Sequence, residues 1–168
     1  MNVSDLWLEL YGRIPPLVGA AVDGLDADQL VWQPSPDANT IGWLVWHLIR
    51  VQDHHVAEIL DTDQVWIGGD WARRFGLQPD PSNTGYGHGV DEVLAVRPES
   101  ARALVEYLDA VDGRTRAMLA DVSEIELERI VDRRWDPPVT LGVRLVSIAD
   151  DCLQHAGQAA YVRGLLDT

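Results

Sequence analysis

Two residues near the C-terminus, Asp151 and His155, place a carboxylate and an imidazole four positions apart. On an α-helix this spacing puts both side chains on one face. His155 is also the only clearly polar member of a stripe that recurs at alternating steps of four and three, a pattern typical of a buried helical face. The members of this stripe are Leu141, Leu145, Ile148, Cys152, His155, Ala159, Val162 and Leu166. A histidine that points inward with an acid beside it needs a further polar partner, for which other parts of the chain offer candidates.

The best partner in the sequence is His47, about a hundred residues earlier. A helix predicted over Ile41–Leu60 places His47 and His54 two turns apart, so that both face the same interior. His54 is therefore a candidate general base, fourth ligand or supporting group. Its neighbour His55 could take this role instead. His88 lies in a glycine-rich stretch and is expected to be an ordinary loop histidine.

Two imidazoles and one carboxylate form a ligand set found at catalytic zinc sites, and nickel or iron(II) also accepts it. If His47 meets Asp151 and His155 in the core, these three residues are candidate metal ligands. Three protein ligands leave positions for water or substrate, so the chemistry would be Lewis-acid activation. A dication would also balance the buried carboxylate. The alternatives are a purely structural acid–imidazole contact and a metal-free salt bridge from Arg144 to Asp151.

Four amphipathic helices are expected to position these side chains. Ser4 is the expected cap of the first, which Pro15-Pro16 should kink or split because each proline lacks an amide donor. Pro98 is expected to open the third helix and Thr140 to cap the fourth. The predicted segments are residues 6–24, 41–60, 98–121 and 141–166. No convincing strand pattern is present, so residues 1–168 are predicted to form a single all-α domain, a four-helix bundle.

A long irregular crossover, residues 62–98, separates the second and third predicted helices. Its glycines and prolines indicate loop, with one short helical turn expected at Asp70–Phe75. It also carries several aromatic residues. Long loops in compact domains are usually functional, so a lid over a pocket is one interpretation, and aromatics that merely anchor the crossover are the other.

Charge and composition exclude several classes of function. The 168 residues carry a net charge of −14, and all 13 basic residues are arginine. Such a chain lacks the basic stripe that nucleic acids and anionic membranes require. No apolar run is long enough to span a membrane and the N-terminus lacks a signal core, so a cytoplasmic location is expected. Cys152, the single cysteine, is expected to be an inert buried thiol.

Two short motifs resemble a known family. Residues 39–48, Asn-Thr-Ile-Gly-Trp-Leu-Val-Trp-His-Leu, resemble the second helix of the DinB-like superfamily, and residues 154–158, Gln-His-Ala-Gly-Gln, resemble the matching part of its last helix. The superfamily includes mycothiol-dependent maleylpyruvate isomerase and related bacterial thiol S-transferases. The resemblance implies a four-helix bundle with a divalent metal at one end of the core, held by His47, Asp151 and His155. Aspartate stands where relatives have histidine or glutamate.

The resemblance and the residues together suggest a metal-dependent enzyme. The first hypothesis is a thiol (mycothiol-type) S-transferase, in which a metal, zinc first of all, activates a low-molecular-weight thiol to attack a small electrophilic molecule. A metal-dependent hydrolase is the enzymatic alternative. The remaining alternative is a non-catalytic homodimeric binding bundle whose polar trio is structural or vestigial.

Overall fold

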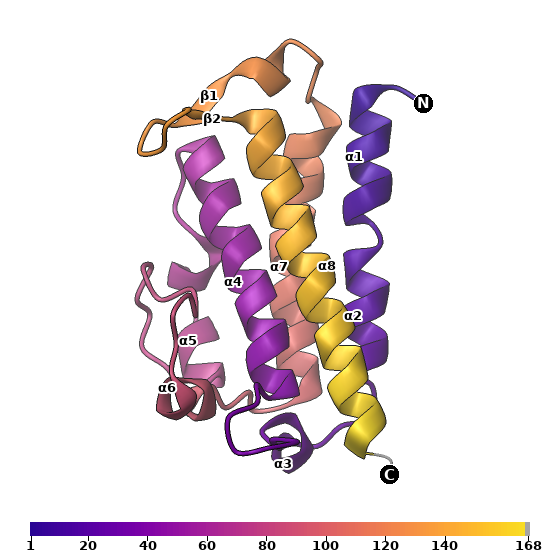
Figure 1. Ribbon diagram of the computed structural model, residues 1–168, viewed down its shortest axis with the longest axis vertical. Helices are drawn as coiled ribbons and strands as arrows, with labels where there is room; N and C mark the ends of the chain where they lie inside the picture. Colours follow the sequence, from indigo (N-terminus) through magenta and orange to yellow (C-terminus); the bar gives the residue numbers. More distant parts are fainter. Residues whose placement is uncertain (167–168) are drawn as a thin grey trace.

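Four long helical segments pack together in the computed structural model, which describes residues 1–166 (Figure 1). Helices α1 (Val3–Tyr11) and α2 (Ile14–Val22) form the first segment. The other three are α4 (Ile41–Leu60), α7 (Ala101–Ala120) and α8 (Leu141–Leu166). Their apolar faces contribute to one hydrophobic core. The structure therefore confirms the predicted all-α bundle.

The first segment is split at the predicted place. Pro15 and Pro16 lie in the first turn of α2, where a missing amide N–H breaks no helical hydrogen bond. The cap of α1 was predicted wrongly. Asn2 caps this helix, accepting the N–H of Asp5 while the Asp5 carboxylate accepts the N–H of Asn2. Ser4 lies inside α1 and donates its hydroxyl hydrogen to the Leu119 carbonyl.

Helix α4 is the central element of the bundle, and most of its residues are buried. Its bounds agree with the prediction, and the Thr40 hydroxyl caps it by accepting the N–H of Trp43. A close approach requires glycine near its start: a Cβ on Gly42 would lie 2.9 Å from the Leu30 carbonyl oxygen. Leu30 ends α3 (Ala27–Leu30), a short helix that lies between the first two predicted helical segments.

The two C-terminal helices begin at hydroxyl caps. The Ser100 hydroxyl accepts the N–H of Ala103, so α7 starts after Ser100, and Pro98 lies outside the helix rather than opening it. Thr140 was predicted correctly as the cap of α8, since its hydroxyl accepts the N–H of Val143. A bilayer-spanning helix is not found within residues 1–166, because no helix there is both long and apolar enough.

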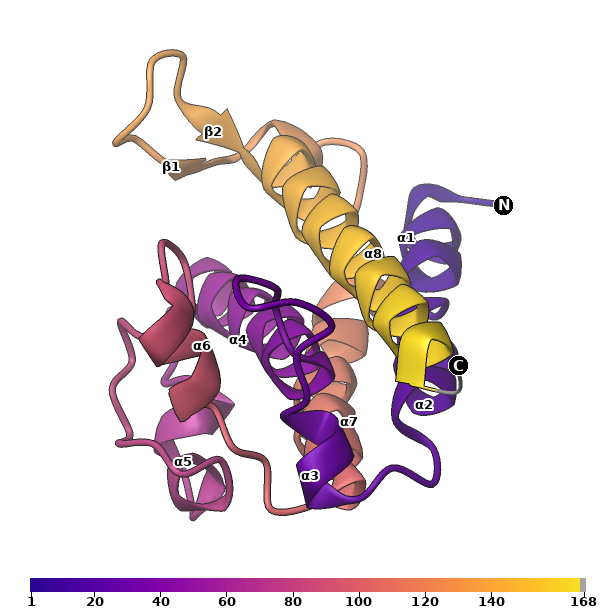
Figure 2. The ribbon, with the colours of Figure 1, turned by 60° about the horizontal axis from the view of Figure 1, so that its bottom comes forward.

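The crossover runs along the outside of α4 on its way to α7 (Figures 1 and 2). It contains η1 (Val65–Ile67), α5 (Trp71–Arg74) and α6 (Val90–Ala95). The second of these confirms the predicted helical turn, while the third was not foreseen. Trp66 and Phe75 are fully buried against Tyr107 of α7, so these aromatics anchor the crossover. Tyr86, in contrast, is 93% exposed.

A short antiparallel hairpin precedes α8, which corrects the expectation that the chain has no strands. It consists of β1 (Ile130–Asp132) and β2 (Val139–Thr140), and follows the exposed turn η2 (Glu126–Glu128). Strands of two and three residues are too short to show an alternating pattern in the sequence. Figure 2 shows the hairpin projecting from the end of the bundle at which α8 begins.

Candidate metal centre

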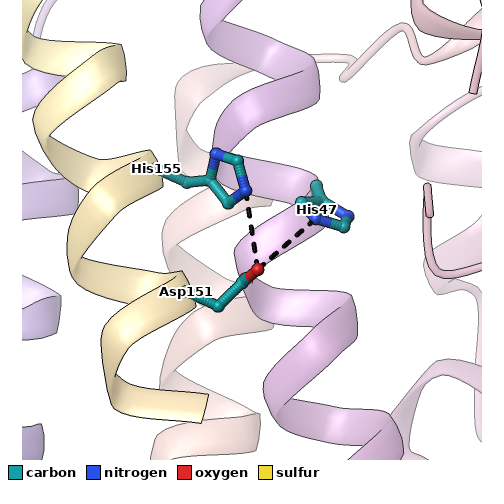
Figure 3. A group of neighbouring side chains, drawn as sticks. All are labelled: His47, Asp151 and His155. Atoms are coloured by element: carbon teal, nitrogen blue, oxygen red, sulfur yellow. Dashed lines mark ion pairs between the residues drawn. The ribbon is translucent and has the colours of Figure 1, made fainter. Parts of the chain in front are cut away.

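The structure brings His47 of α4 together with Asp151 and His155 of α8 (Figure 3). One ligand-type atom from each lies within 4.8 Å of the others. Asp151 Oδ1 is 3.9 Å from Nε2 of His47 and 3.6 Å from Nε2 of His155. The three residues predicted from the sequence thus converge on one point.

The crossover fixes the orientation of His47. Its Nδ1 lies 2.5 Å from the Thr84 carbonyl oxygen, which can only accept, so Nδ1 carries the hydrogen and Nε2 keeps its lone pair toward Asp151. Gly85 follows with φ of +93°, and a Cβ there would lie 2.7 Å from Nδ1 of His47. The Trp43 ring stacks on the His47 ring, with the two ring centroids 4.7 Å apart. Burial lowers the pKa of His47, which favours the neutral ring that a metal ligand requires.

His155 presents the same nitrogen to the same point. Its Nδ1 lies 2.8 Å from Oε1 of Gln158, and an amide oxygen accepts, so the Nε2 lone pair of the neutral ring faces Asp151. The ring meets His47 nearly edge-on, with centroids 4.8 Å apart. In metal-free protein the nearby Asp151 carboxylate raises the pKa of His155, because it favours the protonated, positively charged ring beside it.

Asp151 provides the observation that most favours a cation. Its Oδ1 faces both imidazoles, while Oδ2 is buried and has no hydrogen-bond partner among residues 1–166. Buried polar atoms are nearly always paired, and electron-rich atoms that face one another repel unless a cation lies among them. A divalent metal fits this donor set, and a proton shared between Asp151 and His155 is the smaller alternative.

Arg144 does not form the salt bridge to Asp151 that was considered as an alternative. Its guanidinium lies 2.7 Å from Asp132 of β1 and 3.4 Å from Nε2 of His55. The hairpin, which could not be foreseen, thus supplies the carboxylate that holds Arg144. Asp151 remains available to the two histidines.

His54 and His55 form a second group of potential ligands with Glu58. Nε2 of His54 lies 3.7 Å, and Nδ1 of His55 3.3 Å, from the same oxygen, Oε2 of Glu58. The opposite ring nitrogens face donors: the Gln64 amide nitrogen at 3.1 Å from His54, and Arg144 beside His55. A nitrogen that accepts keeps its lone pair there, so the hydrogens lie on the nitrogens that face Glu58. Nδ1 of His55 therefore donates a hydrogen bond to Glu58, whereas Nε2 of His54 faces the same carboxylate at the longer distance of 3.7 Å.

A cavity of about 310 Å³ adjoins the trio. His47, Asp151, His54 and the exposed Tyr86 are among its lining residues. His54 is therefore near the candidate centre, although it lies outside the group that converges on Asp151. Its role as a general base or supporting group stays a prediction.

Three residues of the crossover that support the site were missed or undervalued. The Thr84 carbonyl and Gly85 orient His47, and neither was singled out. His88 lies in a loop, as expected, but its Nδ1 accepts the indole N–H of Trp43 at 3.1 Å and its ring stacks on Trp46. The glycine-bracketed sequence around Gly85 was the only available signal, because backbone carbonyls leave no mark in a sequence.

Cys152 agrees with its prediction. It is fully buried next to Asp151, and its thiol points to the Leu48 carbonyl oxygen at 3.5 Å. Burial raises the pKa of the Cys152 thiol well above its ordinary value, so the thiol stays protonated and unreactive.

Comparison with known proteins agrees with this architecture. Residues 14–159 match the sequence model of a protein family that is described as the DinB superfamily. The chain belongs to the DinB superfamily. Membership of the DinB superfamily usually accompanies metal binding, which is consistent with the converging trio.

One solved structure extends the comparison over almost the whole chain. The crystal structure of a conserved protein from Enterococcus faecalis superposes with a TM-score of 0.88 and 30% sequence identity. The match covers 97% of this chain and 96% of that one. No curated protein is similar enough to this chain to count as a match.

Proposed function

We propose that His47, Asp151 and His155 hold a divalent metal, zinc in the first place and nickel or iron as alternatives, and that the protein is a metal-dependent thiol S-transferase. The observation that carries the metal proposal is the arrangement of the two imidazoles. Each binds an acceptor through Nδ1 and turns Nε2 toward the same carboxylate oxygen. Metal-binding histidines are usually held in this way by a group that accepts their other N–H.

The cavity supports a small substrate. At about 310 Å³ it lies at the lower end of the size range of small-molecule pockets. Its lining combines polar groups at the trio with the apolar surface of Val51 and the exposed ring of Tyr86. A compact electrophile beside a thiol would fit such a space.

The chain's own residues would divide the work between them. A bound metal would act as a Lewis acid that lowers the pKa of a thiol. His47 and His155 would hold the metal as neutral ligands, and Asp151 would contribute the negative charge that offsets one of its two positive charges. The thiolate sulfur would form a bond to the electrophilic carbon, and the leaving group would depart with its bonding electrons. The thiol proton would pass to solvent, or to Nδ1 of His54 once that nitrogen gives up its hydrogen bond from Gln64.

Metal analysis of protein purified without an affinity tag tests the proposal. We expect about one equivalent of metal in the wild type and a large loss in His47→Ala and His155→Ala. A wild type without stoichiometric metal, even after incubation with zinc, would overturn the proposal.

A screen of low-molecular-weight thiols with electrophilic acceptors then tests the reaction. Thiol-dependent turnover that chelators abolish supports the S-transferase. Chelator-sensitive turnover with water alone would instead indicate the hydrolase, and a metal-loaded protein inactive in both assays would favour the binding bundle.

A further inference from the structure

Arg50 connects the interior of the bundle to the segment that orients His47. It lies on α4, three residues after His47, and is fully buried. A guanidinium has five N–H donors, and the structure gives an acceptor to each. The acceptors are the carbonyls of Pro81 and Asn83, the side-chain oxygen of Gln64, the Asp53 carboxylate and the Tyr107 hydroxyl, at 2.9–3.4 Å.

The charge of Arg50 is balanced within the core. Asp53 is also buried, and its carboxylate accepts the N–H groups of Val65 and Trp66, at 2.8 Å each. The guanidinium lies over the Trp66 ring at 4.8 Å. Well-packed apolar residues often stabilise a core as well as a buried ion pair does, so stability alone is a weak explanation for this one. The distinguishing feature of Arg50 is the set of crossover carbonyls that it binds.

These carbonyls are directly connected to the candidate metal centre. Nε of Arg50 donates to the Asn83 carbonyl at 3.0 Å, and the carbonyl of the next residue, Thr84, accepts the Nδ1–H of His47. The Asn83 side chain also lies 3.0 Å from Nε2 of His88, which fastens the segment on its other side. The Arg50 guanidinium thus binds the carbonyl of the residue that immediately precedes Thr84 in the chain.

We propose that Arg50 is a positioning residue for the metal centre: it fixes the Pro81 and Asn83 carbonyls, and thereby holds the Thr84 carbonyl against Nδ1 of His47. The hydrogen of His47 then stays on Nδ1 and its Nε2 lone pair stays directed at Asp151. Lysine cannot replace the guanidinium, because a single ammonium nitrogen cannot reach both carbonyls and Asp53 together. The inference rests on the proposed metal binding.

Arg50→Lys tests the inference, with Arg74→Lys as the matched control. Arg74 also anchors the crossover, through Glu99 and Glu106 and over the Trp71 ring, but its ion pairs are with other residues than those of the 81–84 segment. The first quantity measured is the zinc affinity, by competition with a chelating indicator. The second is the tautomer of His47 in metal-free protein, from the NMR chemical shifts of its imidazole nitrogens at a pH well above the ordinary histidine pKa.

We expect Arg50→Lys to weaken zinc binding about 10-fold or more, as loss of groups that orient metal ligands does. Metal-free wild type should show His47 with its hydrogen on Nδ1, and Arg50→Lys should show a mixture of tautomers. Arg74→Lys should change neither quantity. If Arg50→Lys does not fold, Gln64→Leu takes its place, because Gln64 accepts from Arg50 and donates to the Pro81 carbonyl.

Other outcomes separate this inference from the proposed function. If the wild type binds no zinc, the metal proposal fails, and the tautomer measurement alone decides whether Arg50 orients His47. If zinc binds but the Arg50 and Gln64 variants leave affinity and tautomer unchanged, the inference is overturned while the metal proposal stands. A wild-type His47 with its hydrogen on Nε2, or equal weakening of zinc binding by Arg74→Lys, would also overturn it.

Discussion

Helix α4 contributes to two clusters that each contain two histidines and one carboxylate, and the hydrogen-bond partners of the histidines differ between them. In the first, His47 and His155 bind acceptors through Nδ1 and direct lone pairs at Asp151. In the second, His54 accepts a hydrogen bond on its outer nitrogen and directs an N–H at Glu58. The composition of the two clusters differs only in aspartate against glutamate. The groups behind the rings decide which nitrogen carries the hydrogen.

The charges around the clusters differ in the same sense. Arg134 lies 3.2 Å from Oε1 of Glu58, and Arg144 contacts His55, so the second carboxylate already has a cationic partner. The charged groups that act on the pKa of His47 are instead Asp151 and two histidines. A dication would be repelled by the arginines at the second cluster and attracted by the unbalanced carboxylate at the first. A prediction based on residue types alone would place a metal site at both clusters.

The strongest test of this comparison removes one carboxylate from each cluster. We expect Asp151→Asn to weaken zinc binding by about 100-fold or more, because it removes both a ligand and the balancing charge. Glu58→Gln should leave the affinity within about twofold, since it removes no ligand. Competition titration with a chelating indicator measures both. A larger effect of Glu58→Gln would mean that the metal site has been assigned to the wrong cluster.

A second test concerns the group behind His47. Gly85→Ala would place a methyl group 2.7 Å from Nδ1 of His47, whereas a methyl group at Gly87 would have no atom of residues 1–166 within 4 Å beyond its own chain neighbours. Both glycines have positive φ, so both variants should lose about 1 kcal/mol or more of unfolding free energy through backbone strain. Zinc affinity should fall about 10- to 100-fold only in Gly85→Ala. Equal affinities in the two variants would contradict the role given to Thr84 and Gly85.

The second cluster predicts a pH dependence of stability. Burial, and then Arg144, lower the pKa of His55 from 6.5 to about 4. As the pH falls from 6.5 to about 4, His55 becomes protonated in the unfolded chain but stays neutral in the native state, so the unfolding free energy decreases. The His55 contribution should be on the order of 1–3 kcal/mol between these pH values. Urea unfolding of metal-free wild type and of His55→Gln at several pH values measures this contribution. If the unfolding free energy changes with pH by the same amount in both proteins, His55 makes no such contribution.

The smallest expected effect is that of Arg134→Ala. The Arg134 side chain is 68% exposed, so loss of its ion pairs should change the unfolding free energy by less than about 1 kcal/mol. Because the histidine tautomers at Glu58 would persist, the variant should bind no additional zinc. A second equivalent of zinc in Arg134→Ala would show that charge rather than tautomer excludes metal from this cluster.

The sequence predicted the elements whose signals are periodic or repeated. The bounds of α4 followed from helical spacing, because the bundle keeps each helix's buried face turned inward. The meeting of His47 with Asp151 and His155 was a hypothesis from that spacing, which the resemblance to the DinB-like superfamily supported. The break between α1 and α2 followed from Pro15-Pro16. Errors at the helix starts, Ser4 and Pro98, arose where several capping residues stood close together.

The features that could not be predicted depend on single contacts over long sequence separations. The hairpin around Asp132 removes Arg144 from Asp151, yet neither strand is long enough to be read from the sequence. The Thr84 carbonyl acts through the backbone, which is the same for any residue. The Glu58 cluster had a visible i, i+4 signal, but its hydrogen positions depend on Gln64 and Arg144, which belong to other segments.

The position of the trio along the chain also bears on when the protein could acquire a metal during its synthesis. His47 belongs to an early helix, whereas Asp151 and His155 lie about a hundred residues later, on α8. A nascent chain that has folded α1 to α7 would offer only one of the three proposed ligands. The chain would therefore bind its metal only after α8 has left the ribosome and packed against α4. Metal binding would then indicate that α8 has docked.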